Sequence, residues 1–262
     1  MMSRNRLGYP TRLLEGPLRD RIERAASFGA RGVQLDLRYE LRPDDLSDTG
    51  RRQFHRLLQE QGLSLAPPVI PQRRALTETA GLDERVAAIT SAVRLAGELK
   101  ARELIVRPGP IPAVDDAGRE LFVEVLNDLA RAGDHVGVTL LLTTGREDAS
   151  VLVDLLGSIV SGPVGANLDP AACIMAGRDP AVLARHLHDR LGHVRIRDGL
   201  QEADGSGVEV AVGRGEVDWE ALVATLAEIG YGGWLTPDRT TGDDPARDAA
   251  RAVAYVTNVL PF

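Results

Sequence analysis

Short apolar segments and longer segments of helical periodicity alternate along this chain, and this alternation restricts the fold more than any other feature. In the longer segments apolar residues recur three and four positions apart, as in Val86, Ile89 and Val93, which is typical of a helix with one buried side. Repeated strand and helix units predict a parallel sheet covered by helices. Eight segments qualify as strands, at 6–9, 32–37, 63–66, 103–106, 138–142, 164–168, 193–196 and 233–236.

The number of repeated units favours a closed barrel over an open, doubly wound sheet. No Gly-x-Gly-x-x-Gly turn follows the first candidate strand, and eight units are what a closed α/β barrel contains. A length of 262 residues is ordinary for one such barrel, and no linker rich in proline, glycine or serine divides the chain. We therefore predict an α/β fold with a single (β/α)8 barrel domain over residues 1–262.

Charge and composition narrow the range of partners. The formal net charge of −7 leaves no overall basic footprint, so we expect no nucleic acid partner. The N-terminus has no apolar signal core, and no later run approaches about 18 consecutive apolar residues, so we expect a cytoplasmic protein without a membrane partner. The single cysteine, Cys173, excludes an intramolecular disulfide and predicts a buried thiol in a reducing compartment.

Short polar residues and glycines predict where helices begin and end. Aspartates that can accept hydrogen bonds from free backbone N–H groups precede three helical segments, at Asp83, Asp115 and Asp218. Glycines, which adopt the left-handed conformation at little cost, lie at or near four predicted helix ends, at Gly62, Gly97, Gly133 and Gly230.

The most specific motif lies near the C-terminus, where the run 212–219 reads Val-Gly-Arg-Gly-Glu-Val-Asp-Trp and the run 230–233 reads Gly-Tyr-Gly-Gly. These runs resemble the xylose isomerase-like TIM barrel family, which includes sugar phosphate isomerases and epimerases and, more distantly, endonuclease IV. Further matches, from about Arg6 to the C-terminus, are the runs at 29–35, 137–140, 164–169 and 193–198. The resemblance implies a TIM barrel with its site at the C-terminal ends of the strands.

The resemblance also implies a divalent metal held by four side chains at that end of the barrel. The family has glutamate, aspartate, histidine and glutamate at these places, and the corresponding residues here are Thr143, Asp169, Arg195 and Asp238. Three further family positions, a histidine, a glutamate and a histidine, correspond here to Ala172, Gln34 and Arg107. The ligand set implied by the family is therefore incomplete.

These replacements change the chemistry that the site can perform. Arginine is permanently charged and offers no lone pair, so Thr143, Arg195 and two aspartates make a poor cage for a hard cation. We expect no tightly bound metal and no other cofactor. The family glutamates exchange protons with a carbon next to a carbonyl, and Thr143 cannot do so at neutral pH. The remaining candidates for catalytic residues are Asp169 and Asp238, although an aspartate before proline, as at 169, is also a common turn former.

Four arginines lie at or near the C-terminal ends of predicted strands, where clustered guanidinium groups can pair with carboxylate or phosphate. Individually each could be a surface charge, but together they predict a site for a small anionic ligand. The predicted substrate-binding residues are Arg107, Arg195, Arg197, Arg239, Thr143 and Gln34. We further expect the Arg195 guanidinium to lie within about 4 Å of Asp169 or Asp238, because two facing carboxylates without a metal would repel each other.

Other aromatic and imidazole side chains have simpler interpretations. We expect Trp219 and Trp234 to pack helices against the barrel. His186 and His188 are two positions apart on a predicted helix, point in different directions, and are not predicted to bind metal.

Two classes of function remain. One is a sugar isomerase or epimerase-like enzyme with a degenerate metal site, acting on or binding a small anionic sugar derivative. The other is a non-catalytic member of the family that binds a sugar or anion or interacts with another protein. Measurements of bound metal and of turnover would separate these two classes. The sequence does not indicate whether the protein forms oligomers.

Overall fold

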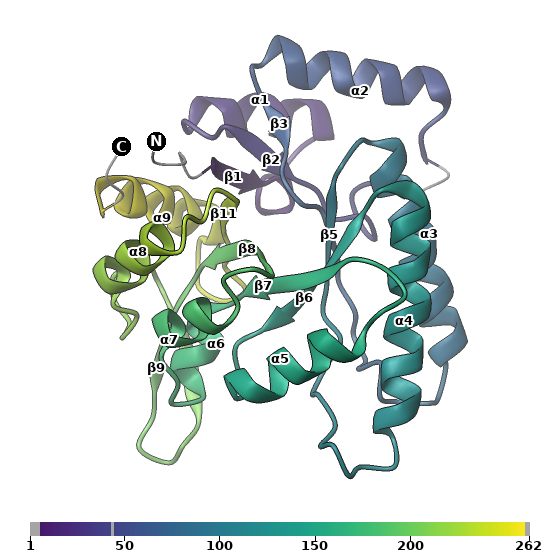
Figure 1. Cartoon of the computed structure of the whole chain (residues 1–262). Coiled ribbons are helices and arrows are strands. Elements are labelled where there is room, and N and C mark those ends of the chain that lie inside the picture. Colours follow the sequence, from purple (N-terminus) through teal and green to yellow (C-terminus); the bar gives the residue numbers. More distant parts are fainter. Residues whose placement is uncertain (1–5, 43–44, 260–262) are drawn as a thin grey trace.

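The computed structural model describes residues 6–42 and 45–259, and it has a curled sheet of parallel strands surrounded by helices (Figure 1). The strand order is β3-β2-β1-β11-β8-β7-β6-β5-β4. These strands are β1 (Arg6–Pro10), β2 (Gly32–Gln34), β3 (Ser64–Leu65), β4 (Val69–Ile70), β5 (Glu103–Val106), β6 (Thr139–Thr144), β7 (Val164–Leu168), β8 (Leu191–Ile196) and β11 (Trp234–Pro237). All eight predicted strands overlap observed ones, and the predicted α/β barrel is confirmed.

The third strand of the barrel is split into β3 and β4, and this split closes the sheet. Pro67 and Pro68 lie between the two pieces and supply no backbone N–H to a ladder. After them Val69 donates to Leu35 O and accepts from Leu37 N, in a parallel bridge that joins β4 to the segment after β2. The observed strands β2 and β3 are shorter than the predicted strands 32–37 and 63–66, and β4 completes the third strand of the barrel after the two prolines.

The helices lie outside the sheet and bury one apolar side each, as the periodicity predicts. On α3, Ile89, Val93 and Ala96 are fully buried. The helices are α1 (Leu18–Ser27), α2 (Asp48–Glu60), α3 (Leu82–Glu98), α4 (Arg119–Val136), α5 (Ala149–Ser158), α6 (Pro170–Met175), α7 (Pro180–His186), α8 (Trp219–Glu228) and α9 (Pro245–Val259), with a 3-10 turn η1 (Thr11–Leu13). None of these helices combines the length and the apolar character needed to cross a bilayer.

A two-stranded antiparallel hairpin interrupts the barrel pattern after β8. It consists of β9 (Asp198–Gln201) and β10 (Gly207–Val210), and it extends away from the barrel at the lower left of Figure 1. The run 203–207, interpreted from the sequence as a loop, is the tip of this hairpin together with its first returning residue.

Five helices end at a glycine in the left-handed conformation. Within two residues of their ends, α1, α2, α4, α6 and α8 have a glycine with positive φ, namely Gly29, Gly62, Gly137, Gly177 and Gly230. At the end of α3 the equivalent residue is Lys100, with φ of 58°.

Two of the predicted glycine positions have another physical basis. Gly97 and Gly133 lie inside α3 and α4 rather than beyond their ends. A Cβ on Gly97 would press against Val136, and a Cβ on Gly133 would clash with the carbonyl of Val138. Close approach of neighbouring backbone, rather than a left-handed conformation, therefore requires these glycines.

The predicted helix starts are correct at one of three aspartates. Asp218 caps α8 by accepting a hydrogen bond from Ala221 N. Asp83 lies in the first turn of α3, and Gly81 occupies the cap position of that helix. Asp115 precedes α4 by several residues, and Gly118 takes the cap position.

The prediction for Trp234 is wrong. Its ring lies against Gly8 and Gly32 of the neighbouring strands, where a Cβ on Gly32 would clash with it. Trp234 therefore fills the interior at the N-terminal end of the barrel instead of packing a helix onto its outside. Trp219 is the buried first residue of α8, as expected of a helix that packs on the barrel.

Candidate functional site

The C-terminal motif organises a loop around one buried carboxylate. Asp198, which is 0% exposed, accepts hydrogen bonds from the backbone N–H groups of Gly213, Gly215 and Val217 and from the Trp219 indole. A Cβ on Gly215 would collide with this carboxylate. The run 212–219 is thus a structural clasp that holds the chain between β10 and α8, and it supplies no side chain to the chemistry of the mouth described next.

The C-terminal ends of the strands surround two adjoining cavities. The larger, of about 670 Å³, is lined by Arg107, Thr143, Asp169, Arg195 and Arg197, among others. The smaller, of about 270 Å³, shares Arg107, Thr143 and Arg195 with it and adds Gln34 and Asp238. The structure therefore brings seven of the eight predicted site residues to one mouth. Arg239 lies beside it without lining either cavity.

Each charged residue is placed by the element that ends beside the mouth. Asp169 follows β7 and caps α6, where its Oδ1 accepts from Ala172 N at 3.1 Å. Arg195 lies on β8, between the fully buried side chains of Val194 and Ile196 that face away from the mouth. Asp238 follows β11, so all three side chains meet where parallel strands end.

These groups form a continuous chain of ion pairs with alternating sign, which we call the mouth network. Arg195 Nη1 lies 2.7 Å from Asp238 Oδ2 and 3.6 Å from Asp169 Oδ2. The predicted approach of Arg195 to these aspartates is confirmed. The complete network contains, in order, Arg12, Asp238, Arg195, Asp169, Arg197, Glu209, Arg239 and Asp248.

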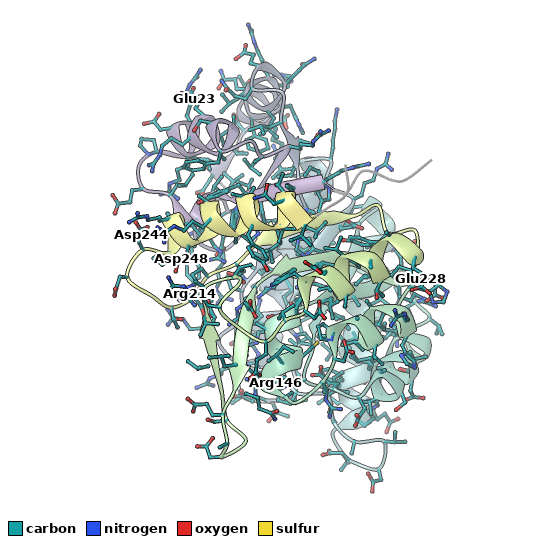
Figure 2. All side chains as sticks on the ribbon, turned by 90° about the vertical axis from the view of Figure 1, so that its left-hand side faces the viewer. Glu23, Arg146, Arg214, Glu228, Asp244 and Asp248 are labelled. Atoms are coloured by element: carbon teal, nitrogen blue, oxygen red, sulfur yellow. The ribbon has the colours of Figure 1, made fainter. Side chains whose placement is uncertain are left out.

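The hairpin and the last helix extend this network beyond the strands. Arg197 lies 2.7 Å from both Asp169 Oδ2 and Glu209 Oε2, so it joins β7 to the hairpin. Arg239 then connects Glu209, at 3.2 Å, with Asp248, at 3.0 Å. In Figure 2, Asp248 marks this end of the network, at the start of α9.

Pairing controls the ionisation of the network. Burial alone would raise the pKa of Asp238, but Arg195, Arg12 and Arg197 outweigh it and hold the pKa at about 2. Burial likewise opposes the lowered pKa of Glu209, which Thr240 and Arg197 stabilise as a carboxylate. Asp169 and Glu209 in turn raise the pKa of Arg197 despite its burial. At neutral pH these groups are charged, and Asp238 in particular is a weak proton acceptor.

The mouth does not fit the divalent metal that the family implies. Both Asp238 oxygens are engaged by arginines, and Asp169 is engaged by two arginines and a backbone N–H. Thr143 Oγ1 accepts from Asn167 Nδ2 at 3.0 Å. Over residues 6–42 and 45–259, no group of three or more histidine, cysteine, aspartate or glutamate side chains could hold a metal ion.

Below Arg195 the barrel contains a buried imidazole. His193, which is fully buried, has Nδ1 2.7 Å from Asn167 Oδ1 and Nε2 2.9 Å from Thr236 Oγ1. Burial and the charge of Arg195 lower the pKa of His193 to about 3, so the ring is neutral. His193 fixes neighbouring polar side chains under the mouth rather than titrating there.

Several residues of the mouth were not predicted from the sequence. Glu209 lies on the hairpin. The Asp204-Gly205 pair at the hairpin tip is a sequence typical of a turn between two antiparallel strands. Arg12 lies in η1 and gave no signal. Arg146, on the loop after β6, lines the larger cavity. Gln34 was predicted to bind substrate, and its amide donates to Pro67 O at 3.0 Å.

Comparison with known proteins agrees with this architecture. The family model described as xylose isomerase-like TIM barrel matches residues 22–258, and the protein belongs to this family. No curated protein matches the sequence significantly.

Solved structures share the fold at low identity. A xylose isomerase domain protein from Planctomyces limnophilus is 22% identical, with a TM-score of 0.84 over 98% of this chain and 96% of that chain. D-psicose 3-epimerase with D-tagatose from Clostridium cellulolyticum H10 is 17% identical, with a TM-score of 0.77 over 98% and 100%. A xylose isomerase-like TIM barrel protein from Mycobacterium smegmatis in complex with magnesium is 17% identical, with a TM-score of 0.71 over 92% and 87%.

Proposed function

We propose that this protein binds a small anionic sugar derivative in the mouth of the barrel, without a metal, and that the inherited isomerase or epimerase chemistry is lost. The observation that carries the proposal is the position of Arg195, 2.7 Å from Asp238 and 3.6 Å from Asp169. A guanidinium there offsets the carboxylates that would otherwise require a cation. The metal site of the family is, in this proposal, degenerate.

Two arginines support an anionic ligand. Arg107 and Arg146 line the larger cavity, and neither guanidinium group has a carboxylate within 4.0 Å among the residues that the structure describes. The cavity volume of about 670 Å³ lies in the range of small-molecule sites. We assign the anionic group to Arg107 and Arg146, and we assign the sugar hydroxyls to the polar floor made by Thr143 and Arg197.

Sugars enter the proposal through the relatives. D-psicose 3-epimerase, solved with D-tagatose, and L-ribulose 3-epimerase share this fold. Catalysis by proton transfer would need a group near the ligand that releases and regains a proton, and Asp238, held at a pKa of about 2 mainly by Arg195 against the effect of its burial, is poorly suited to this. A cytoplasmic role in carbohydrate metabolism is consistent with the single buried cysteine.

Titration calorimetry tests the proposal with three ligands: a sugar phosphate, the matching sugar acid and the neutral parent sugar. We expect the anionic ligands to bind more tightly, and we expect Arg107→Ala or Arg146→Ala to weaken them at least tenfold. Arg185→Ala removes an arginine that pairs with Glu228 on the outer surface, and it is the matched control. Tighter binding of the neutral sugar would contradict the proposal.

Elemental analysis and turnover assays separate the enzyme from the binding protein. We expect substoichiometric manganese, cobalt, zinc and magnesium after dialysis and no metal-stimulated isomerisation or epimerisation of the bound sugar. One equivalent of a metal that survives dialysis, together with turnover that depends on it, would show that the family chemistry persists.

A further inference from the structure

A separate cavity lies at the opposite end of the barrel, where the strands begin. It has a volume of about 530 Å³ and lies between the barrel and the C-terminal ends of α2 and α3. Arg6 begins β1, Glu103 begins β5 and Trp234 begins β11, and all three line this cavity. The N-terminal end of such a barrel usually serves stability, so a charged cavity there requires an explanation.

The lining includes a residue in a conformation that favours glycine. Lys100 has φ of 58° and is the only residue other than glycine with a positive φ over residues 6–42 and 45–259. It ends α3 in the hydrogen-bond pattern in which Lys100 N donates to Gly97 O and Ala101 N donates to Ala96 O. The other left-handed helix ends in the described part of the chain have glycine, so a lysine here has a conformational cost.

The lining is strongly basic. Arg6, Lys100 and Arg102 contribute three cationic side chains, against a single carboxyl group, that of Glu103. None of these three cations has a carboxylate within 4.0 Å among the described residues. Arg6 lies over the Trp234 ring, 5.7 Å from its centroid, which fixes its guanidinium at the cavity.

Two further polar groups face this end of the barrel without partners in the described part of the chain. The Nε2 atom of His55, on α2, is buried and has no hydrogen bond. Glu103 has no ion pair, and its Oε1 lies within 3.0 Å of the position of a Cβ on Gly192, so the side chain points inward. Burial raises the pKa of Glu103 to about 7, against the opposing effect of Arg6 and Arg102.

We propose that this cavity is a second ligand site, which binds a small oxyanion of the phosphate type between Arg6, Lys100 and Arg102. Cations without carboxylate partners at the rim attract the anion, and guanidinium groups and an ammonium group are its usual partners. Protonated Glu103 can donate a hydrogen bond to it. The proposal is independent of the function proposed for the mouth.

The test uses inorganic phosphate and calorimetry on the full chain with the mouth disabled by Arg107→Ala and Arg146→Ala. We expect one equivalent of phosphate to bind, and we expect Lys100→Gly in the same background to weaken binding at least tenfold. Glycine suits the left-handed conformation, so Lys100→Gly should leave the melting temperature unchanged or raise it by a few degrees. If Lys100 served only the fold, Lys100→Gly would not weaken phosphate binding while leaving the melting temperature unchanged.

Two controls make the result decisive. Arg56→Ala removes an arginine on α2 that pairs with the exposed Glu60, and it should bind phosphate as the parent does. Comparing inorganic phosphate with a hexose phosphate distinguishes the free ion from the phosphoryl group of a metabolite, and saturable binding of either supports the proposal. Absence of phosphate and hexose phosphate binding, or equal affinity of the Lys100→Gly variant, would overturn it.

Discussion

The Arg195 guanidinium lies 2.7 Å from the Asp238 carboxylate, at the place where the family resemblance puts a metal-ligating histidine. A guanidinium group can balance negative charge as a metal ion does, but it offers no open coordination position. Under the proposed function, the substitution therefore keeps the electrostatic balance of the mouth while the Lewis acid is lost. The predictions that follow separate these two consequences.

Restoring ligands should restore metal affinity. Arg195→His with Thr143→Glu would replace a positive charge by a lone-pair donor and add a carboxylate beside Asp169 and Asp238. We expect the double variant to bind Mn²⁺ at least tenfold more tightly than the parent in calorimetry. The control is Arg195→His with Thr143→Gln, because glutamine has a volume similar to that of glutamate and adds no charge. Equal Mn²⁺ affinity of the parent and the Arg195→His, Thr143→Glu variant would mean that the family positions are misassigned.

Removing Arg195 alone should destabilise the protein. Arg195→Ala leaves two buried carboxylates facing each other, with only Arg12 and Arg197 to offset them. We expect a loss of about 2 kcal/mol in the free energy of unfolding, measured in urea. Combining it with Asp238→Asn should cost less than the sum of the two single variants, because the pair is lost only once. Strict additivity would mean that the two residues do not interact.

The clasp at Asp198 predicts contrasting effects of two alanine substitutions at glycine. Gly215→Ala places a methyl group against the Asp198 carboxylate and should cost about 2 kcal/mol of stability. Gly157→Ala lies in α5 with no atom within 4 Å of the added methyl group, and it should gain about 0.5 kcal/mol. Thermal unfolding of the two variants measures both changes in stability. An unchanged stability of the Gly215→Ala variant would show that the loop adjusts to the added methyl group.

The Glu103 carboxyl makes stability depend on pH in an unusual direction. Its pKa is raised from 4.5 to about 7, chiefly by burial, so folding favours the protonated form. That contribution is fully present below the unfolded pKa of 4.5 and is lost as the pH rises through about 7. Glu103→Gln, which stays neutral, should therefore melt at a higher temperature than the parent at pH 8.5 and at a similar temperature at pH 4.5. A difference that is constant across this range would contradict the assigned shift.

The sequence predicted the barrel because local signals and the global fold agree in this chain. The strand segments are rich in apolar residues, and the pairing of parallel strands brings residues 169, 195 and 238 to one end of the barrel. That is why the Arg195 contact could be expected from alignment and charge alone. The split at Pro67 was readable in principle, because proline cannot donate to a ladder.

Other features depend on tertiary structure and could not be predicted in this way. Glu209 reaches Arg197 only because β10 pairs with β9 so that Glu209 lies opposite Gly199, next to the end of β8, and neither spacing nor periodicity encodes that pairing. The inward direction of Trp234 depends on two glycines that lie far away in the sequence, Gly8 and Gly32. Lys100 gives no signal of its own in the sequence, because the glycine three residues earlier, Gly97, predicts the helix end.

The mouth network also determines how a ligand would be captured. Its four arginines and four carboxylates cancel, so they contribute little to the potential at a distance, while the whole chain has a net charge of −7. At physiological salt, where the Debye length is about 8 Å, both the repulsion of an anion by the net charge and its attraction to Arg107 and Arg146 act only near the mouth. Added salt screens the long-range repulsion as well as the short-range attraction, so the association rate should vary little with ionic strength. The dissociation rate should carry most of the salt dependence.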